Sequence, residues 1–177
     1  NPPWHGDHSG GNEGLGKAGA LIVAHDAVRA RMSTEQVMAA FGQRVPPSPA
    51  EALPLVTYGR DMTFHINGDT IRVLHTPAAH TDGDSIVHFE RANAIHAGDT
   101  YVNTGFPFID LSSGGSLDGV IAAAEKSLAL ADDETRIIPG HGALSNRAEL
   151  DAYRRMLVDV RARVAKAVAD GRSADDV

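Results

Sequence analysis

The chain has 177 residues, a formal net charge of −7 and no cysteine. This length suits one domain with a buried core, and we treat residues 1–177 as a single domain. An acidic chain argues against nucleic-acid or anionic-membrane partners, because both need a basic surface. No apolar run reaches the ~18 residues of a membrane-spanning helix. Disulfides, thiolate metal sites and cysteine nucleophiles are excluded, whereas the compartment stays open, the periplasm and the exterior included.

The first half of the chain predicts short elements broken by turns. Residues 1–16 are rich in Gly, Pro, Asp and His, which predicts a loop leading into a short helix. The apolar run 20–24 predicts a buried strand, and Asp26 is a candidate cap for a helix whose apolar positions continue to Phe41. Prolines between 46 and 54 predict an exposed linker. Asn67-Gly68, between residues 62–66 and 70–74, predicts a β-hairpin.

The second half predicts longer elements. Residues 85–89 and 94–97 form a predicted strand pair, and apolar positions at helical spacing predict a helix over residues 116–131. A short strand at residues 136–138 is expected to end at Pro139-Gly140, before an amphipathic surface helix over residues 147–169. This mixed order predicts an α/β fold in which helices cover the faces of sheets.

Histidine and aspartate gather in Gly-containing loops that follow apolar strands. The candidates are His5, Asp7 and His8 in the first loop, then His80, Asp99 and His141. Loops at strand ends are where a rigid scaffold presents reactive groups. Imidazole and carboxylate without thiolate suit zinc, manganese or iron. If the first loop is extended, His5 and Asp7 point to the same side, while His8 turns toward a second metal.

These motifs, in this order, resemble those of the metallo-β-lactamase superfamily, whose first motif reads His-x-His-x-Asp-His. The resemblance implies an αββα sandwich and a hydrolase with two metals, expected to be zinc, whose metal-bound hydroxide is the nucleophile. It assigns His5 and His80 to one metal, Asp7, His8 and His141 to the other, and Asp99 to a bridge between them. Asp7 is the catalytic candidate, because it is expected to orient the hydroxide.

Two departures from the family pattern change this expectation. Pro3 stands where the motif has its first histidine and offers no side-chain ligand. If Pro3 disables the first site, one zinc is expected, held by Asp7, His8, Asp99 and His141. The motif also begins within a few residues of Asn1, so the sandwich is expected to be incomplete at the N-terminus. Exposed sheet edges then make a homodimer an option.

The predicted function is zinc-dependent hydrolysis of a small-molecule ester, thioester, lactone or amide-like substrate, near the glyoxalase II-like and cyclase-like bacterial branches. β-Lactam cleavage, as main or side reaction, stays open. A truncated or degenerate homologue that binds metal without catalysis is the alternative that Pro3 favours, and an iron oxidoreductase is a third.

The remaining candidates have ordinary structural interpretations. Five histidines are predicted to be structural: His25, His65, His75, His88 and His96. Asp82 and Asp84 are predicted to be turn residues or to lie just outside the ligands. The segment with Phe106 and Phe108 is either a hydrophobic plug or a pocket wall.

Overall fold

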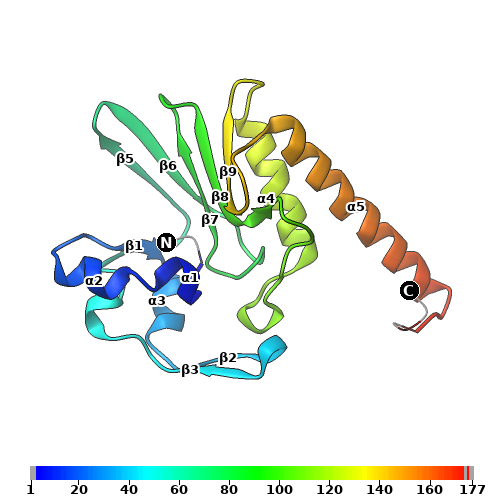
Figure 1. The fold of residues 1–177 in the computed structure, drawn as a ribbon, viewed down its shortest axis with the longest axis horizontal. Helices are drawn as coiled ribbons and strands as arrows, with labels where there is room; N and C mark the ends of the chain where they lie inside the picture. Colours follow the sequence, from blue (N-terminus) through cyan, green and yellow to red (C-terminus); the bar gives the residue numbers. More distant parts are fainter. Residues whose placement is uncertain (1–2, 174, 176–177) are drawn as a thin grey trace.

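The computed structural model describes residues 3–173 and 175, so the first two residues of the predicted N-terminal loop lie outside the described part. The strands of its largest sheet are β5 (Asp61–Ile66), β6 (Asp69–His75), β7 (Ser85–Phe89), β8 (Ala94–Val102), β9 (Arg136–His141) and β10 (Ser145–Asn146). Their spatial order is β10–β9–β8–β7–β6–β5 (Figure 1). Only β8 and β9 are parallel among these neighbours.

Two long helices pack on this sheet: α4 (Leu117–Leu130) and α5 (Arg147–Ala169). They lie against each other and contact strands β7, β8 and β9 (Figure 1). The core between sheet and helices includes Ile95, Ile137, Val120 and Leu150, each 0% exposed. Burying an aliphatic side chain of this kind contributes about 1.5–3 kcal/mol, so this layer stabilises the platform under the functional loops. The predicted α/β fold is therefore confirmed.

The N-terminal elements lie together below the sheet in Figure 1. They are the helices α1 (Gly6–Ser9), α2 (Asn12–Lys17) and α3 (Asp26–Met32), the strands β1 (Val23–His25), β2 (Gln36–Met38), β3 (Gln43–Val45) and β4 (Val56–Tyr58), and the 3-10 helices η1 (Ala39–Phe41) and η2 (Ala50–Ala52). A third 3-10 helix, η3 (Leu111–Ser113), follows β8. Strands β1 and β4 pair in parallel, and β2 and β3 form an antiparallel hairpin. A second core around Trp4, Val28 and Met32 holds this part together.

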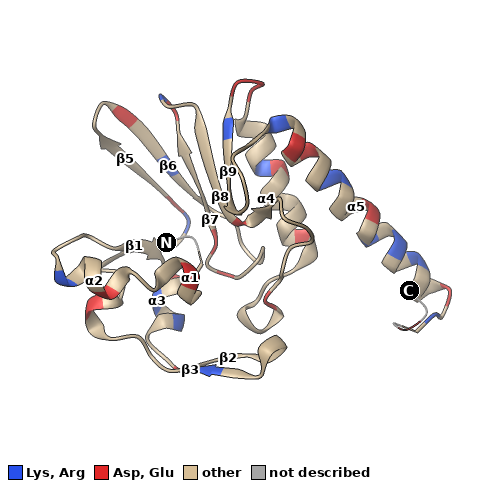
Figure 2. Cartoon of the chain, viewed as in Figure 1, with Lys and Arg blue, Asp and Glu red and all other residues tan. Residues whose placement is uncertain are grey.

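Several local predictions are confirmed. Asn67 and Gly68 both have positive φ, 54° and 71°, as the tight turn between β5 and β6 requires. Helix α4 begins after Ser116, whose side chain accepts a hydrogen bond from the backbone N–H of Gly119. Helix α5 has the predicted bounds, and its charged residues are spread along its length (Figure 2). None of the helices in the described part is both long and apolar enough to cross a membrane.

Four local predictions are wrong. The buried strand predicted at residues 20–24 is displaced, because β1 covers Val23–His25 and Leu21 is 59% exposed. The helix predicted to continue to Phe41 ends at Met32, because residues 36–45 form the β2–β3 hairpin, which turns at Gly42 with a φ of 60°. The cap of α3 is His25 rather than Asp26, since its side chain accepts from the N–H of Ala27. Strand β9 continues through Pro139 to His141, because a parallel strand beside a bulge tolerates the missing N–H of proline.

Two of the histidines that were predicted to be structural stack where the N-terminal part meets the sheet. The rings of His25 and His75 have centroids 3.7 Å apart and an interplanar angle of 12°. His75 Nε2 lies 2.9 Å from the carbonyl oxygen of Asp82, to which it donates a hydrogen bond. Burial lowers the pKa of His75 below its usual value, and repulsion from His25 and Lys126 acts in the same direction. The folded protein therefore favours neutral His75.

This lowered pKa predicts how stability varies with pH. Because unfolded His75 binds a proton more readily, its contribution to stability is complete above pH 6.5 and is lost as the pH falls below that value. For His75→Gln we expect the free energy of unfolding to depend less steeply on pH, by at most about 1.4 kcal/mol per pH unit. Urea unfolding in the presence of a chelator measures this, with the exposed His65→Gln as control. Equal slopes for His75→Gln and the unaltered protein would contradict the prediction.

Candidate metal centre

The first motif forms a helical turn rather than an extended segment. His5 is the N-cap of α1, and its carbonyl oxygen accepts from the N–H groups of His8 and Ser9 at 3.1 and 2.9 Å. His5 itself keeps extended backbone angles, with φ −60° and ψ 151°, whereas Asp7 and His8 lie within the helical turn. Asp7 therefore joins His8 in one group of donors, and the expectation that Asp7 goes with His5 while His8 turns away is wrong.

The structure brings all six predicted site residues together, in two groups that share Asp99. One group is His5, His80 and Asp99, and the other is Asp7, His8, Asp99 and His141. Within each group the donor atoms lie within 4.8 Å of one another. These are the two sets implied by the family resemblance. In the part of the chain that the structure describes, none of the other five histidines joins such a group.

Histidine and carboxylate contacts dominate the second group. His8 Nε2 lies 3.0 Å from Asp99 Oδ2 and 3.2 Å from Asp7 Oδ2. His141 Nε2 lies 3.0 Å from Asp7 Oδ2 and 3.4 Å from Asp99 Oδ1. The hydrogen bond to Asp99 raises the pKa of His8. Burial acts to raise the pKa of Asp99, but the hydrogen bond from His8 and the nearby histidines outweigh it, and the pKa lies below the usual value.

Two buried polar atoms test whether these residues fit a metal. His80 Nδ1 and Asp99 Oδ1 are buried and make no well-formed hydrogen bond among the described residues; they have only longer charged contacts, 3.5 Å to Asp84 Oδ1 and 3.4 Å to His141 Nε2. His80 and Asp99 are only 2% and 6% exposed, so water does not compensate these atoms well, and leaving them unsatisfied is costly. A cation held by imidazole nitrogen and carboxylate oxygen would satisfy both. The donor set, which has no sulfur, therefore fits a divalent metal such as zinc, manganese or iron.

Sequence reasoning missed one residue beside the first group. Asp110 is 3% exposed, and its Oδ2 lies 3.0 Å from His5 Nε2. The sequence around it, Asp-Leu-Ser-Ser-Gly-Gly, signals only a turn. A contact between residues 105 positions apart has no local signal. Asp84, predicted to lie in a turn or just outside the ligands, is fully buried, and its Oδ1 is 3.5 Å from His80 Nδ1.

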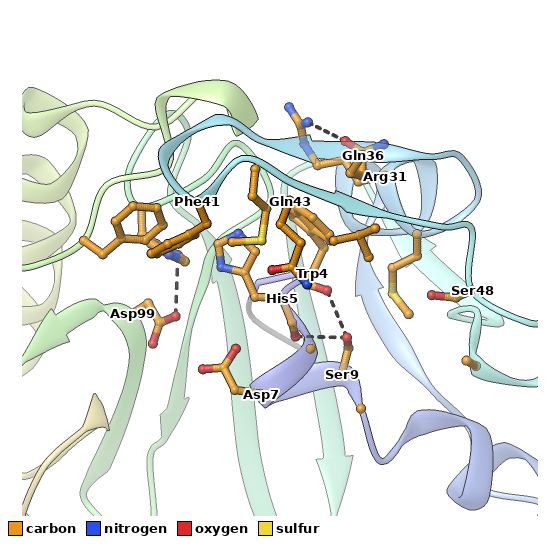
Figure 3. A pocket seen from close by; sticks show the side chains of 18 of the residues that line it. Trp4, His5, Asp7, Ser9, Arg31, Gln36, Phe41, Gln43, Ser48 and Asp99 are labelled. Atoms are coloured by element: carbon orange, nitrogen blue, oxygen red, sulfur yellow. Dashed lines mark hydrogen bonds and ion pairs between the residues drawn. The ribbon is translucent and has the colours of Figure 1, made fainter.

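Both groups open into a cavity of about 690 Å³. In Figure 3, Phe41 and Gln43 of the overlying hairpin region face His5, Asp7 and Asp99 across this space. Phe106 and Phe108 also line it, and the rings of Phe41 and Phe108 are 5.1 Å apart, so the pocket-wall alternative is confirmed. Among the described residues that line the cavity, Arg31 is the only lysine or arginine.

The guanidinium group of Arg31 forms an ion pair with Asp82. Arg31 Nε and Nη2 lie 2.8 and 2.6 Å from the two oxygens of Asp82, and Nη1 lies 3.1 Å from Gln36 Oε1. The guanidinium therefore ties α3 to β2 and to the loop after His80. The rest of the lining consists of apolar side chains, the two histidine–aspartate groups, Glu13 and neutral polar side chains such as Gln43.

Comparison with known proteins agrees with this geometry. The sequence model of the metallo-beta-lactamase superfamily matches residues 4–141. A hydroxyacylglutathione hydrolase of Nitrosococcus oceani is 30% identical over 148 residues, which cover 80% of this chain and 47% of that protein. The chain thus spans about half the length of this relative.

Solved structures show the same fold. A metallo-beta-lactamase from Pontibacter korlensis superimposes with a TM-score of 0.68 at 20% identity, over 88% of this chain and 66% of that one. TTHA1623, solved in a di-iron-bound form, gives a TM-score of 0.65 at 23% identity, over 85% of this chain and 72% of that one. With the family motifs gathered around Asp99 and the family match spanning most of its length, this chain belongs to the metallo-β-lactamase superfamily.

Proposed function

We propose that the chain is a zinc-dependent hydrolase that cleaves a carboxylic ester, thioester or lactone of a small molecule. The observation that carries the proposal is the pair of histidine–aspartate groups that share Asp99 and open into one cavity. His5, His80 and Asp99 would hold one metal, and Asp7, His8, Asp99 and His141 the other. When bound, such metals acidify water to a pKa of about 7 and polarise a substrate carbonyl.

Asp7 is the residue that we assign to handling the proton. Its side chain is 53% exposed and lines the cavity, whereas the Asp99 side chain is 8% exposed. Its Oδ2 lies 3.0 Å from His141 Nε2, so the carboxylate is oriented at the mouth of the second group. This exposure and this orientation support the proposal that the Asp7 carboxylate accepts a hydrogen bond from an attacking water and holds its proton.

The cavity walls favour a substrate with an apolar, uncharged acyl portion. Phe41, Phe106 and Phe108 supply aromatic surface, and the single lysine or arginine among the described lining residues is paired with Asp82. The N. oceani relative is named as a hydrolase of hydroxyacylglutathione, which is a thioester, and this supports testing thioesters first. The di-iron form of TTHA1623 makes iron the second metal to test.

Pro3→His tests whether the first group is a disabled metal site. We expect about one zinc per unaltered chain, at the second group, and two in Pro3→His, because the substitution restores the ligand missing from the family motif. Hydrolysis of the best substrate should then rise by about tenfold or more, the scale on which even residues around a metal affect activity. Elemental analysis after dialysis gives the zinc content, and kcat/KM is measured on a panel of thioesters, lactones, aryl esters and β-lactams.

Pro47→His is the matched control, because it adds a histidine at an exposed proline outside both groups. It should change neither zinc content nor turnover. If both the unaltered protein and Pro3→His bind zinc but hydrolyse nothing in the panel, the alternative of a metal-binding protein without catalysis is favoured. Absence of bound metal from both proteins would overturn the proposed function. Turnover that requires iron and oxygen would favour the oxidoreductase alternative.

A further inference from the structure

We infer that Asp110, together with Ser113 and Trp4, is a positioning residue that fixes the tautomer of His5, with the proton on Nε2 and the lone pair on Nδ1. This rests on the proposed function, because it treats His5 as a metal ligand. A neutral histidine ligates only through the ring nitrogen that carries no proton, and the partner of the other nitrogen decides which one that is. The inference is that His5 offers Nδ1 to the first group.

The direction of the hydrogen bonds follows from donors whose role is fixed. Trp4 Nε1 lies 3.0 Å from Ser113 Oγ, and an indole N–H can only donate. Ser113 Oγ therefore accepts from Trp4 and directs its own proton to Asp110 Oδ2, 2.6 Å away. This relay makes Asp110 Oδ2 an acceptor at one of its two contacts.

The other carboxylate oxygen of Asp110, Oδ1, also accepts hydrogen bonds only. Asp110 Oδ1 lies 3.0 and 3.2 Å from the backbone nitrogens of Ser112 and Ser113, which can only donate, and it also accepts from the Ser112 hydroxyl. A carboxylate surrounded by donors in this way is an acceptor at both oxygens. Across the remaining contact, 3.0 Å long, His5 Nε2 must then be the donor. Nδ1 is the only ring nitrogen of His5 left with a free lone pair.

The same loop also braces the second histidine of the group. The backbone N–H of Asp110 donates to the carbonyl oxygen of His80 at 3.0 Å. Gly115 N–H donates to the carbonyl oxygen of Asp110, and a Cβ on Gly115 would lie 2.3 Å from the His80 carbonyl oxygen, so the loop fits closely only with glycine there. The rings of His5 and His80 are held edge to face, with centroids 4.7 Å apart. With Pro3 offering no third imidazole, the orientation of these two rings decides whether the first group can hold a metal.

Asp110→Asn tests the inference, because backbone N–H groups determine the orientation of the new side-chain amide. Its oxygen must face the N–H groups of Ser112 and Ser113, which leaves the amide NH₂ facing His5 Nε2. That NH₂ donates where the carboxylate accepted, so we expect the proton of His5 to move to Nδ1. The tautomer is read from two-bond ¹H–¹⁵N correlation spectra of ¹⁵N-labelled, metal-free protein. The zinc affinity of the weaker site, measured by chelator competition, should fall about 10–100-fold.

Asp132→Asn is the matched control. Asp132 also accepts hydrogen bonds at a turn, from Thr135, Asn93 and the N–H of Glu134, but it contacts no histidine. This variant should leave both the His5 tautomer and zinc affinity unchanged. A His5 that carries its proton on Nδ1 in the unaltered protein would overturn the inference, even if Asp110→Asn does not fold. So would an Asp110→Asn protein with an unaltered tautomer. The His5 tautomer is measured without metal or substrate, whereas the proposed function is tested by zinc content and turnover. The failure of one can therefore be distinguished from the failure of the other.

Discussion

Asp99→Ala is expected to remove the zinc held by the second group, to weaken further any binding at the first group, and to lower kcat/KM more than about a hundredfold. Asp99 is the one residue that both groups share, and its oxygens lie 3.0 Å from His8, 3.6 Å from His80 and 3.4 Å from His141. Loss of a residue that merely surrounds a metal site costs about 10–100-fold, so loss of a shared ligand should cost more. Metal content after dialysis and kcat/KM on the best ester or thioester substrate measure the effect.

Asp118→Ala separates this effect from a general loss of negative charge. Asp118 is 77% exposed and pairs with Arg161, on the helices rather than at the site. That variant should keep its metal and its turnover. Retention of the bound zinc by Asp99→Ala would show that metal binding does not depend on this shared carboxylate, and circular dichroism establishes whether the variant is folded.

Gly140→Ala is expected to displace Asp99, because Gly140 lies on β9 directly beside it. A Cβ at residue 140 would lie 2.0 Å from Asp99 Oδ1, 2.7 Å from the carbonyl carbon of Gly98 and 2.8 Å from the backbone nitrogen of Asp99. Two of these atoms belong to the backbone of β8, so β9 must move away from it. We expect metal loss together with a decrease of about 1–3 kcal/mol in the free energy of unfolding, the usual cost of overpacking. Urea unfolding with chelator isolates the stability change.

Gly14→Ala makes the same chemical change where there is room for it. A Cβ on Gly14 would meet nothing within 4 Å, and the residue lies inside α2. Alanine should stabilise that helix by up to about 1 kcal/mol and leave metal content unchanged. If Gly140→Ala kept its metal and matched Gly14→Ala in stability, the close approach of β9 to Asp99 would be unimportant.

The elements that sequence predicted well are those whose signal is local. The turn at Asn67-Gly68 and the apolar spacing in α4 and α5 are complete within their own segments. Residues 36–41 were wrongly predicted to be helical because Val37, Met38 and Phe41 have helical spacing. In the structure they belong to the β2–β3 hairpin and η1 at the cavity. Tertiary context overrides a weak local preference there.

The six site residues were predictable because four ordered motifs carry them, but their setting was not. The turn of helix that starts after His5 has only four residues and no apolar repeat to mark it. The contact between Asp110 and His5 joins distant loops and leaves no pattern in either one. The sequence therefore indicated which side chains meet. The hydrogen bonds that orient these side chains could be identified only from the structure.

The origin of the site residues also bears on folding. They come from the loop and turn at residues 5–8, the loop at His80, strand β8 and the end of β9, so they meet only when the chain has closed on itself. A metal held by all of them would bind the folded chain alone, and at a free concentration a hundred times its Kd it would add about 2.7 kcal/mol to stability. In a chain without cysteine, such an ion would act as a reversible cross-link between the N-terminal turn and β9.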